Sequence, residues 1–510
     1  MNRRQFLVSS SAALATTAVH SRLRLVAEQS HGFPVSLLNN DSYIENTPIP
    51  EYQSASASAY EAFQDMKFGV RIHWGIYSIW HRGAESWPFI TMSFEDRQAY
   101  DNLYRTWNPT GFDADAWLDT FKESGMKMFA FTTKHHEGFS MFDTSTRVKN
   151  RVNWTAAGGP RIESCDLAYS IMETPFKRDI VKELCTAAHK RNIKIDLYFS
   201  HPDWYDADFR PYVAHPLQVP SSAEWMIPAD LEMTRQRLGN HALIVPDPSE
   251  AEVERMMERH RTQLVELLTN YGKIDMICLD MWLGPRVWPE LRKTVMKLRQ
   301  IQPDVMLRDR GIGNYGDYYT PERVIPGSQD DSDKPWFCIY PLGSDFSYEP
   351  DAAKYKGTQW IVHSLVDTVA KGGGLMIGVG PSSQGLFHSE AIRQMKATGG
   401  WLRVNGEAIY ATRPRAGALW SEGETVRFTR SKDHRFVYAI LTEWPGTQVA
   451  LKTVRPKAGS KVTLLGLNAT MPWHLDSVHG TTITLPESLQ QAGNRPCDYA
   501  WTLKFEMMET

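Results

Sequence analysis

The amino-acid sequence predicts an α/β fold: a (β/α)₈-type (TIM-like) barrel followed by a C-terminal antiparallel β-sandwich. Two observations carry this prediction. Strand-like and helix-like segments alternate from residue 59 to residue 404, and alternation over about 340 residues is typical of a barrel with crossover helices. From residue 405 to residue 510, short alternating runs separated by turns replace this pattern, as in an all-β module.

Six segments of the barrel region have the composition of buried strands. They are residues 67–75, 126–136, 194–202, 273–280, 304–310 and 375–381. Amphipathic helices are expected at residues 176–192, 248–272 and 288–300, where apolar residues recur every three to four positions. An open doubly wound sheet is the alternative, although no G-x-G-x-x-G segment follows the first strand.

The last region contains six short runs that alternate between apolar and polar residues. These runs are residues 425–430, 435–441, 448–454, 461–466, 481–486 and 499–506. Turn residues separate them, and this spacing favours a sandwich of two antiparallel sheets.

The first 21 residues have the features of an export signal. Arg3 and Arg4 are followed by Gln5, Phe6 and Leu7 and by a short apolar run without acidic residues, which resembles a twin-arginine signal. The apolar part is too short to span a bilayer. The mature protein is therefore expected in the periplasm or outside a bacterial cell. Residues 22–58 are polar without a clear period and are expected to form a linker or surface arm.

Composition limits the class of protein. Hydrophobic residues make up 42% and charged residues 23%, which is the balance of a globular chain long enough for two or more domains. The net charge of −3 argues against a nucleic-acid partner. The five cysteines form no close pairs and no metal-type spacing, so neither a disulfide framework nor a zinc site is expected.

The expected strand at 273–280 ends on a carboxylate. In a period-2 pattern Met276, Cys278 and Asp280 share one face, and in a parallel barrel Asp280 lies at the carboxyl end of its strand, where such folds place their chemistry. For an aspartate considered alone, a helix cap or a buried ion pair is the alternative.

Other expected strands end on polar residues in the same way. These residues are Arg71 and His73, His135 and His136, Tyr198 and His201, and Arg308, Asp309 and Arg310. Because the carboxyl ends of parallel strands meet at one rim, these side chains are expected to form a polar ring at the barrel mouth.

Five segments then resemble a known family. KFGVRIHWGIYS, FTTKHHEGFSMFDT, DIVKELCTAAHKRNIKIDLYFS, LVDTVAKGGGLMIGVGPSSQG and GGWLRVNGEAIYATRP are similar to the α-L-fucosidases of glycoside hydrolase family 29 and occur in the family's order. The resemblance implies a retaining exo-hydrolase that releases α-L-fucose from fucosylated oligosaccharides or glycoconjugates. It implies no metal and no cofactor.

The resemblance also implies roles for individual residues. Asp280 takes the place of the family's nucleophile, and Glu322, in a Thr-Pro-Glu segment, takes the place of the acid/base, with Glu349 as the reserve candidate. The residues expected to bind the sugar are His73, His135, His136, Arg310, Phe346, Trp74, Glu85 and Tyr198.

Acid–base chemistry agrees with these roles. A retaining glycosidase uses two carboxyl groups about 5 Å apart, one ionised and one protonated. Arg310 or the nearby histidines are expected to keep the pKa of Asp280 low, whereas the pKa of its partner must be raised. Specificity for linkage and aglycone is expected to reside in the inserts at 147–176 and 205–245.

Three alternatives to a fucosidase follow from the same residues. The first is a related α-L-glycosidase that acts on a sugar such as L-galactose, whose hydroxymethyl group needs space near Phe346. The second is a metal-dependent barrel hydrolase, for which His73, His135, His136, His201 and Asp280 are the ligand types available. The third is a carbohydrate-binding homologue without catalysis, because the residues around Asp280 and Phe337 depart from the family pattern.

Overall fold

The structure is a computed structural model that describes residues 44–45, 47–210, 215–217, 248–327, 334–476 and 478–507. The expected export signal, most of the expected arm and most of the insert at 205–245 lie outside the described residues. No helix within the described ranges is long and apolar enough to cross a membrane. All five cysteines are free thiols.

The first domain is built around a curled parallel sheet with the strand order β7-β6-β5-β2-β1-β9-β8. Its strands are β1 (Phe68–Ile72), β2 (Met128–Lys134), β5 (Lys194–Ser200), β6 (Met276–Asp280), β7 (Met306–Leu307), β8 (Phe337–Pro341) and β9 (Gly374–Gly378). Each of the six segments expected to be a strand overlaps one of these, and β8 is additional. The barrel-type fold predicted from the sequence is confirmed.

An irregular segment at residues 317–323 fills the gap between β7 and β8. On one side the backbone N–H of Asp309 donates to the carbonyl of Tyr318 at 3.0 Å. On the other side the N–H of Ile339 donates to Pro321 and the N–H of Arg323 donates to Ile339, both at 2.9 Å. Since β9 pairs with both β1 and β8, the ring of backbone pairing is closed. This closing segment carries Glu322.

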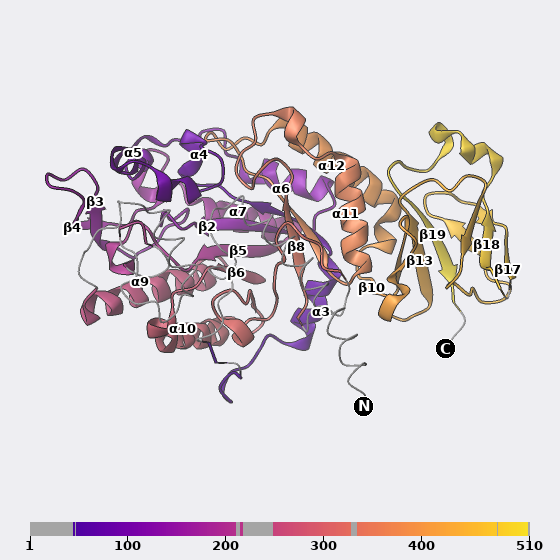
Figure 1. Ribbon diagram of the computed structural model, residues 1–510, viewed down its shortest axis with the longest axis horizontal. Helices are drawn as coiled ribbons and strands as arrows, with labels where there is room; N and C mark the ends of the chain where they lie inside the picture. The colour runs from indigo at the N-terminus through magenta and orange to yellow at the C-terminus, as the bar shows by residue number, and fades with distance from the viewer. Residues whose placement is uncertain are drawn as a thin grey trace, which may run out of the picture.

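Helices surround the outside of the barrel (Figure 1). They are α3 (Ala57–Met66), α4 (Tyr77–Trp80), α5 (Phe94–Tyr100), α6 (Ala114–Glu123), α7 (Ile180–Arg191), α9 (Glu250–Thr269), α10 (Trp288–Ile301), α11 (Thr358–Ala370) and α12 (Ser389–Asn405). Local sequence sets their ends. Ser249 and Glu252 form a capping box at the start of α9, and Asn192 ends α7 in the left-handed conformation. A hairpin of β3 (Val148–Asn153) and β4 (Arg161–Leu167) projects from the domain.

The barrel interior changes character from bottom to mouth. At the amino ends of the strands Met128, Met276, Met306 and Met376 belong to one buried apolar cluster. Close packing there needs Gly69, because a Cβ at that position would lie 2.1 Å from the Met128 sulfur.

One step toward the mouth, the inward-facing residues are polar. Arg71, Asp196, Cys278 and Arg308 are each at most 1% exposed. Cys278 and Asp280 follow Met276 on the inner face of β6, as the period-2 pattern predicted. The barrel therefore has an apolar floor, a charged middle layer and a polar mouth.

Helix α3 closes the bottom of the barrel. Ser56 caps it by accepting from the N–H of Ala59, and its buried residues Phe63 and Met66 join the apolar floor cluster. The Phe63 ring lies 5.0 Å from the rings of both Tyr318 and Phe337.

The second domain is a sandwich of two antiparallel sheets. One sheet has the order β10-β12-β13-β19-β15-β16 with β11 paired to β12, and the other has the order β14-β18-β17. The strands are β10 (Arg413–Pro414), β11 (Ser421–Glu422), β12 (Val426–Arg430), β13 (Phe436–Leu441), β14 (Gln448–Leu451), β15 (Val462–Leu464), β16 (Thr470–Met471), β17 (Trp473–Asp476), β18 (Gly480–Thr484) and β19 (Trp501–Glu506). The predicted sandwich is confirmed.

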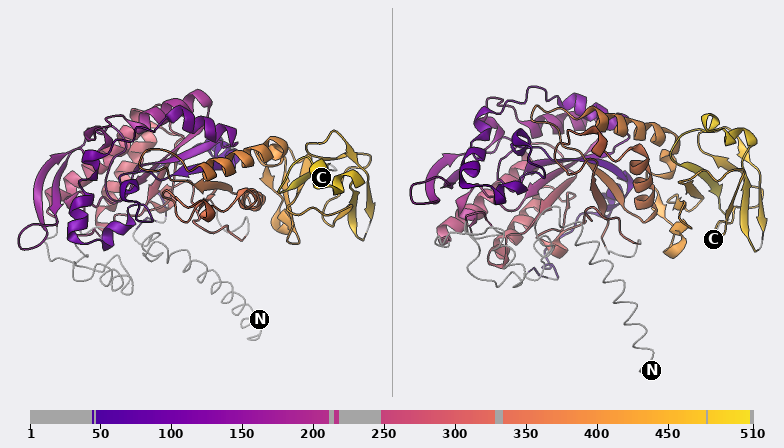
Figure 2. Two further views of the ribbon diagram at one scale, coloured as in Figure 1. Left: turned by 90° about the horizontal axis from the view of Figure 1, so that it is seen from above. Right: turned by 45° about the horizontal axis from the view of Figure 1, so that its top comes forward.

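The sandwich lies beside α11 and α12, at the opposite end of the molecule from the β3–β4 hairpin (Figures 1 and 2). Arg427 on β12 donates to Asp367 on α11 at 2.6 Å, and the Trp401 indole donates to the carbonyl of Ala500 at 2.8 Å. Tyr438 and Ile440 of β13 belong to the same buried apolar cluster as the barrel core. The two domains therefore share part of one hydrophobic core.

Candidate active site

A pocket of about 420 Å³ lies at the carboxyl ends of the barrel strands. Its wall is formed by strand ends and by the loops that follow them. The lining residues are Arg71, His73, Glu85, Trp87, His135, Tyr198, Asp280, Arg308, Arg310, Glu322, Ile339 and Phe346. Most of the polar ring expected from the sequence therefore lines one cavity, but His136, His201 and Asp309 are not part of its wall.

Asp280 is held by several neighbouring groups in this pocket. Its Oδ1 accepts from Arg310 at 2.7 Å and from Arg308 at 3.4 Å. Its Oδ2 accepts from the Tyr198 hydroxyl at 2.6 Å and lies 3.7 Å from Nε2 of His136. Four groups thus fix both carboxylate oxygens in one orientation.

These neighbours keep Asp280 ionised. Burial alone would raise its pKa, but Arg310 and Arg308, together with His136 and the Tyr198 hydrogen bond, outweigh burial and hold the pKa well below its usual value. Asp280 is only 7% exposed, so its charge is poorly solvated by water and acts at close range.

Glu322 is another carboxyl group of the pocket wall, and one guanidinium connects it to Asp280. Nη1 of Arg310 donates to Asp280, and Nη2 of Arg310 donates to Glu322 Oε2 at 2.9 Å. The Glu322 side chain is 23% exposed, against 10% for the Asp280 side chain. A single arginine therefore holds together one deeply buried and one partly solvated carboxyl group.

His73 lies at the end of β1 in a neutral form. Its Nδ1 is 2.8 Å from the Thr132 hydroxyl, and its Nε2 accepts from Arg71 Nε at 3.0 Å. Burial, followed by the charge of Arg71, lowers the pKa of His73 well below its usual value. A neutral imidazole offers a hydrogen-bond donor or acceptor without adding charge to the site.

His135 and His136 directly follow β2, and only His135 lines the pocket. Nδ1 of His135 is 2.5 Å from the hydroxyl of Ser86. Burial and then the neighbouring histidines lower the pKa of His135 well below its usual value. Nε2 of His136 lies near Oδ2 of Asp280, and the centres of the His136 and Trp87 rings are 4.7 Å apart.

Three further lining residues were expected from the sequence, namely Phe346, Glu85 and Tyr198. The centre of the His73 ring lies 5.7 Å from the centre of the Phe346 ring and 5.0 Å from the centre of the Tyr198 ring. Glu85 is 5% exposed and stands in the loop after α4. Ser86, which separates Glu85 from Trp87, is the residue that binds His135.

Besides His136, two residues proposed from the sequence lie away from the pocket wall. The Trp74 ring packs against Trp107 and Trp117, and its Nε1 donates to the carbonyl of Ser382. The reserve carboxylate Glu349 accepts from the backbone N–H of Asp351 at 3.0 Å and lies 3.9 Å from Lys354 Nζ. Sugar contact by Trp74 and acid catalysis by Glu349 remain untested predictions.

Four residues of the pocket wall received no individual role from the sequence, although two of them, Arg71 and Arg308, were expected in the polar ring. The four are Arg71, Trp87, Arg308 and Ile339. Arg71 and Arg308 both donate to Cys278 Sγ, at 3.0 and 3.2 Å. The available signal was strand period, because Arg71 shares a face with His73 and Arg308 shares a face with Arg310.

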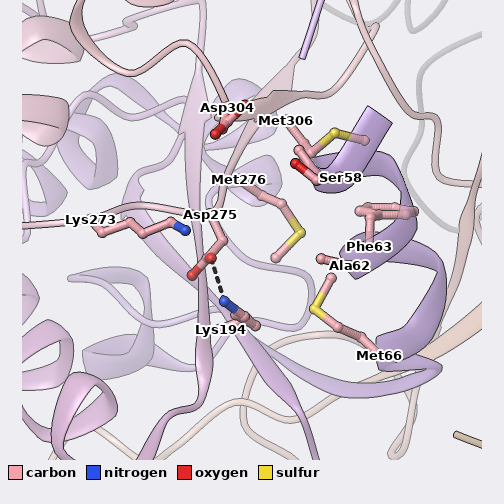
Figure 3. A pocket seen from close by; sticks show the side chains of 11 residues that line it. Ser58, Ala62, Phe63, Met66, Lys194, Lys273, Asp275, Met276, Asp304 and Met306 are labelled. Carbon is pink, nitrogen blue, oxygen red and sulfur yellow. Dashed lines mark hydrogen bonds and ion pairs between the residues drawn. The ribbon is translucent and has the colours of Figure 1, made fainter. Parts of the chain in front are cut away.

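A second pocket, of about 480 Å³, lies at the opposite end of the barrel between α3 and the amino ends of β5, β6 and β7 (Figure 3). Its wall combines Phe63, Met66 and Met276 with an ion pair between Lys194 and Asp275 at 3.0 Å. Catalytic residues of parallel barrels lie at the carboxyl face, so the chemistry is assigned to the pocket around Asp280.

The pocket around Asp280 is equipped for general acid–base and nucleophilic chemistry on a small polar molecule. It contains an ionised carboxylate, a second carboxyl group next to it, neutral histidines and an aromatic face. In the part of the chain that the structure describes, no three side chains of His, Cys, Asp or Glu are grouped so as to hold a metal ion.

Comparisons with known proteins point in one direction. The family model described as alpha-L-fucosidase matches residues 39–407, and the model described as alpha-L-fucosidase C-terminal domain matches residues 421–506. Human tissue alpha-L-fucosidase is 29% identical over 482 residues, which cover 89% of this chain and 91% of that protein.

Two solved structures are similar in fold. Alpha-L-fucosidase isoenzyme 1 from Paenibacillus thiaminolyticus is 24% identical, with a TM-score of 0.69 and coverage of 88% of this chain and 99% of that chain. A GH29 alpha-L-fucosidase from Bacteroides thetaiotaomicron, described as a trapped covalent intermediate with 2-fluoro-fucosyl fluoride, is 22% identical. Its TM-score is 0.69, and the match covers 91% of this chain and 99% of that chain.

Proposed function

We propose that this chain, which belongs to the α-L-fucosidase family, releases α-L-fucose from fucosylated oligosaccharides or glycoconjugates by double displacement. Asp280 is the nucleophile and Glu322 the acid/base. The observation that carries the proposal is the single guanidinium of Arg310, which holds an ionised Asp280 and Glu322 side by side. Retaining glycosidases need two carboxyl groups about 5 Å apart.

In the first step Asp280 attacks the anomeric carbon while the bond from that carbon to the aglycone oxygen breaks. Glu322 gives its proton to the departing oxygen, and a covalent fucosyl ester remains on Asp280. In the second step Glu322 takes a proton from water, the water oxygen attacks the anomeric carbon, and the ester bond to Asp280 breaks. The trapped covalent intermediate described for the Bacteroides protein supports such a two-step path.

The low pKa of Asp280 suits the first step, because only the carboxylate form attacks. The first step needs Glu322 in its protonated form, which the negative charge of Asp280 favours and the neighbouring Arg310 opposes. When Asp280 becomes an ester its charge disappears, so Glu322 ionises more easily and is ready to act as a base.

His73 and His135, both neutral, are proposed to bind the sugar hydroxyls, and Phe346 is proposed to meet the C6 methyl group. The neutral rings fit alternating donors and acceptors, and a buried aromatic face fits an apolar methyl. Because Phe346 is 3% exposed and packed against His73, we propose fucose rather than L-galactose as the preferred sugar.

The test is an assay of the purified protein on an aryl α-L-fucoside and on the matching aryl α-L-galactoside, with and without exhaustive chelation. We expect hydrolysis of the fucoside at least about tenfold faster in kcat/KM than that of the galactoside, since a closely packed pocket discriminates against one added group to that extent. Chelation should leave both rates unchanged.

Other outcomes would contradict the proposal in distinguishable ways. A preference for the galactoside would reassign the sugar, and loss of activity on chelation would favour a metal-dependent hydrolase. Binding of fucose in calorimetry without hydrolysis of either substrate would identify a carbohydrate-binding protein.

A further inference from the structure

Two loops form a joined edge on one side of the pocket around Asp280. The first, after α4, contains His81 and Gly83, and the second, after β8, contains Ser347 and Tyr348. The Ser347 hydroxyl donates to the carbonyl of Gly83 at 2.5 Å, and the rings of His81 and Tyr348 lie 5.7 Å apart, edge to face. Each loop also contributes to the pocket wall, the first through Glu85 and the second through Phe346.

This edge borders the Glu322 side of the pocket. Arg323, the next residue after Glu322, donates to Asp345 Oδ1 at 2.5 Å, and its guanidinium lies 5.1 Å from the centre of the Phe346 ring. Side-chain contacts of Arg323 therefore connect the position next to Glu322 with the loop that contains Tyr348. We call His81, Arg323, Asp345 and Tyr348 the acceptor rim.

The chemistry of the acceptor rim differs from that of the pocket. His81 is exposed, whereas Tyr348, Arg323 and Asp345 are half-buried. Two aromatic rings, a guanidinium and a carboxylate in contact with water offer apolar faces together with hydrogen-bond donors and acceptors. Sugar rings have both kinds of surface, because their C–H faces meet aromatic rings and their hydroxyls meet polar groups.

We propose that the acceptor rim binds the first sugar ring of the leaving group, so that the protein distinguishes oligosaccharides from simple aryl fucosides. This inference rests on the proposed function. Glu322 must reach the oxygen between fucose and aglycone to protonate it, so the aglycone begins next to Glu322. Among the described residues, the acceptor rim is a surface that continues from Glu322 toward solvent.

The same surface serves the second step when a sugar hydroxyl replaces water, so that the first step runs in reverse. The ester on Asp280 is attacked by an oxygen that Glu322 deprotonates, and this oxygen belongs either to water or to a sugar hydroxyl bound at the acceptor rim. With lactose present, part of the fucose is transferred to lactose, which forms a new glycosidic bond as the ester bond breaks and Glu322 takes the hydroxyl proton.

The experiment compares Tyr348→Ala and His81→Ala with the wild type on an aryl α-L-fucoside and on a fucosyl-lactose trisaccharide. We expect kcat/KM for the trisaccharide to fall about tenfold in Tyr348→Ala and less in His81→Ala, as for loss of one aromatic contact, while kcat/KM for the aryl fucoside falls at most about twofold. The control is His474→Ala, which removes an exposed histidine from β17 on the sandwich and should change neither value.

A second readout separates binding from a purely structural role of the His81–Tyr348 contact. With the aryl fucoside as donor and lactose added, Tyr348→Ala should transfer a smaller share of fucose to lactose than the wild type at equal total turnover. Equal losses on both substrates, or an unchanged transfer share, would overturn the inference. Absence of aryl fucoside hydrolysis in the wild type would instead contradict the proposed function.

Discussion

Asp280 depends on residues one layer below it in the barrel. Arg308 donates both to Asp280 and to Cys278, and Arg71 donates both to Cys278 and to His73. The Cys278 sulfur thus accepts from two buried guanidinium groups, one leading to the proposed nucleophile and the other to a proposed sugar ligand. Buried charges need such partners, because an unpaired guanidinium inside a barrel would be strongly destabilising.

This arrangement makes the pH dependence of activity sensitive to Arg308. Asp280 is active as a carboxylate, so activity falls as the pH drops through its folded-state pKa, which Arg310 and Arg308 hold low against the effect of burial. In Arg308→Met one of these cations is gone and the pKa of Asp280 rises. We therefore expect the acid limb of the kcat/KM profile for an aryl α-L-fucoside to move to higher pH.

The control for this prediction is Arg97→Met, which also removes a buried arginine. Arg97 donates to the carbonyls of Phe89 and Ile90 and makes no contact with Asp280. Its profile should keep the acid limb of the wild type. An unshifted acid limb in Arg308→Met would show that Arg308 does not set the charge of the group that limits activity at low pH.

Among the residues, those at strand ends were the most predictable. Asp280, His73 and His135 follow long apolar strands, and the fold rule that places strand ends around one mouth brought them together before any geometry was known. Arg71 and Arg308 were expected in the polar ring, but their bonds to Cys278 were not, because charged residues inside a barrel contradict the usual rule for buried positions. Trp74 follows β1 directly in sequence, but the chain turns there and the indole enters an aromatic cluster.

At the scale of elements, the closing segment and α3 matter most for the site. The segment at 317–323 carries Glu322, and its backbone is bonded to β7 and β8 on either side. The Tyr318 ring of this segment packs on Phe63 of α3. The helix at the bottom of the barrel therefore supports, through Tyr318, the closing segment that holds the proposed acid/base.

We expect Phe63→Ala to lower the free energy of unfolding by about 3–5 kcal/mol, as for truncation of a buried phenylalanine. Phe63 is 2% exposed and contacts both Tyr318 and Phe337. Chemical denaturation measures the loss. KM for an aryl α-L-fucoside, measured well below the melting temperature, should remain that of the wild type because Phe63 lies at the other end of the barrel from Asp280.

The comparison variant is Gln64→Ala on the same helix, which removes a half-buried polar side chain. Its free energy of unfolding should stay within about 0.5 kcal/mol of the wild type. If Phe63→Ala proved as stable as Gln64→Ala, α3 would not close the barrel in the way described.

The helices were easier to predict from the sequence than the closing segment. The apolar spacing of α7 and α9 located both helices, because amphipathicity is a local property. The closing segment has no such signal. It makes only isolated bridges, and its place between β7 and β8 depends on pairing with residues distant in the chain.

For the whole molecule, the order of domains followed from the change in pattern after the last barrel helix. Alternation of strands and helices gave the barrel, and short alternating runs gave the sandwich. The packing between domains did not follow from the sequence, because the residues that join them, such as Arg427 and Asp367, are ordinary surface types until the fold brings them to 2.6 Å. The position of the sandwich at α11 and α12 leaves the barrel mouth to the loops.

The central claim is that Asp280 forms a covalent bond with the sugar while Glu322 moves the proton, and both roles depend on which face of the sugar each carboxyl group meets. The two variants Asp280→Gly and Glu322→Ala separate the roles. In each, a carboxyl group is replaced by space that an azide ion can occupy, and the azide adduct keeps a record of the face from which azide attacked.

The most direct measurement is the stereochemistry of the fucosyl azide formed by Asp280→Gly from an activated aryl α-L-fucoside. Hydrolysis without azide should fall by at least about a thousandfold, as for loss of a catalytic nucleophile, and azide should restore turnover with formation of the β-L-fucosyl azide. Glu322→Ala should instead give the α-L-fucosyl azide. Unchanged hydrolysis by Asp280→Gly, or an α-L-fucosyl azide from that variant, would contradict the account.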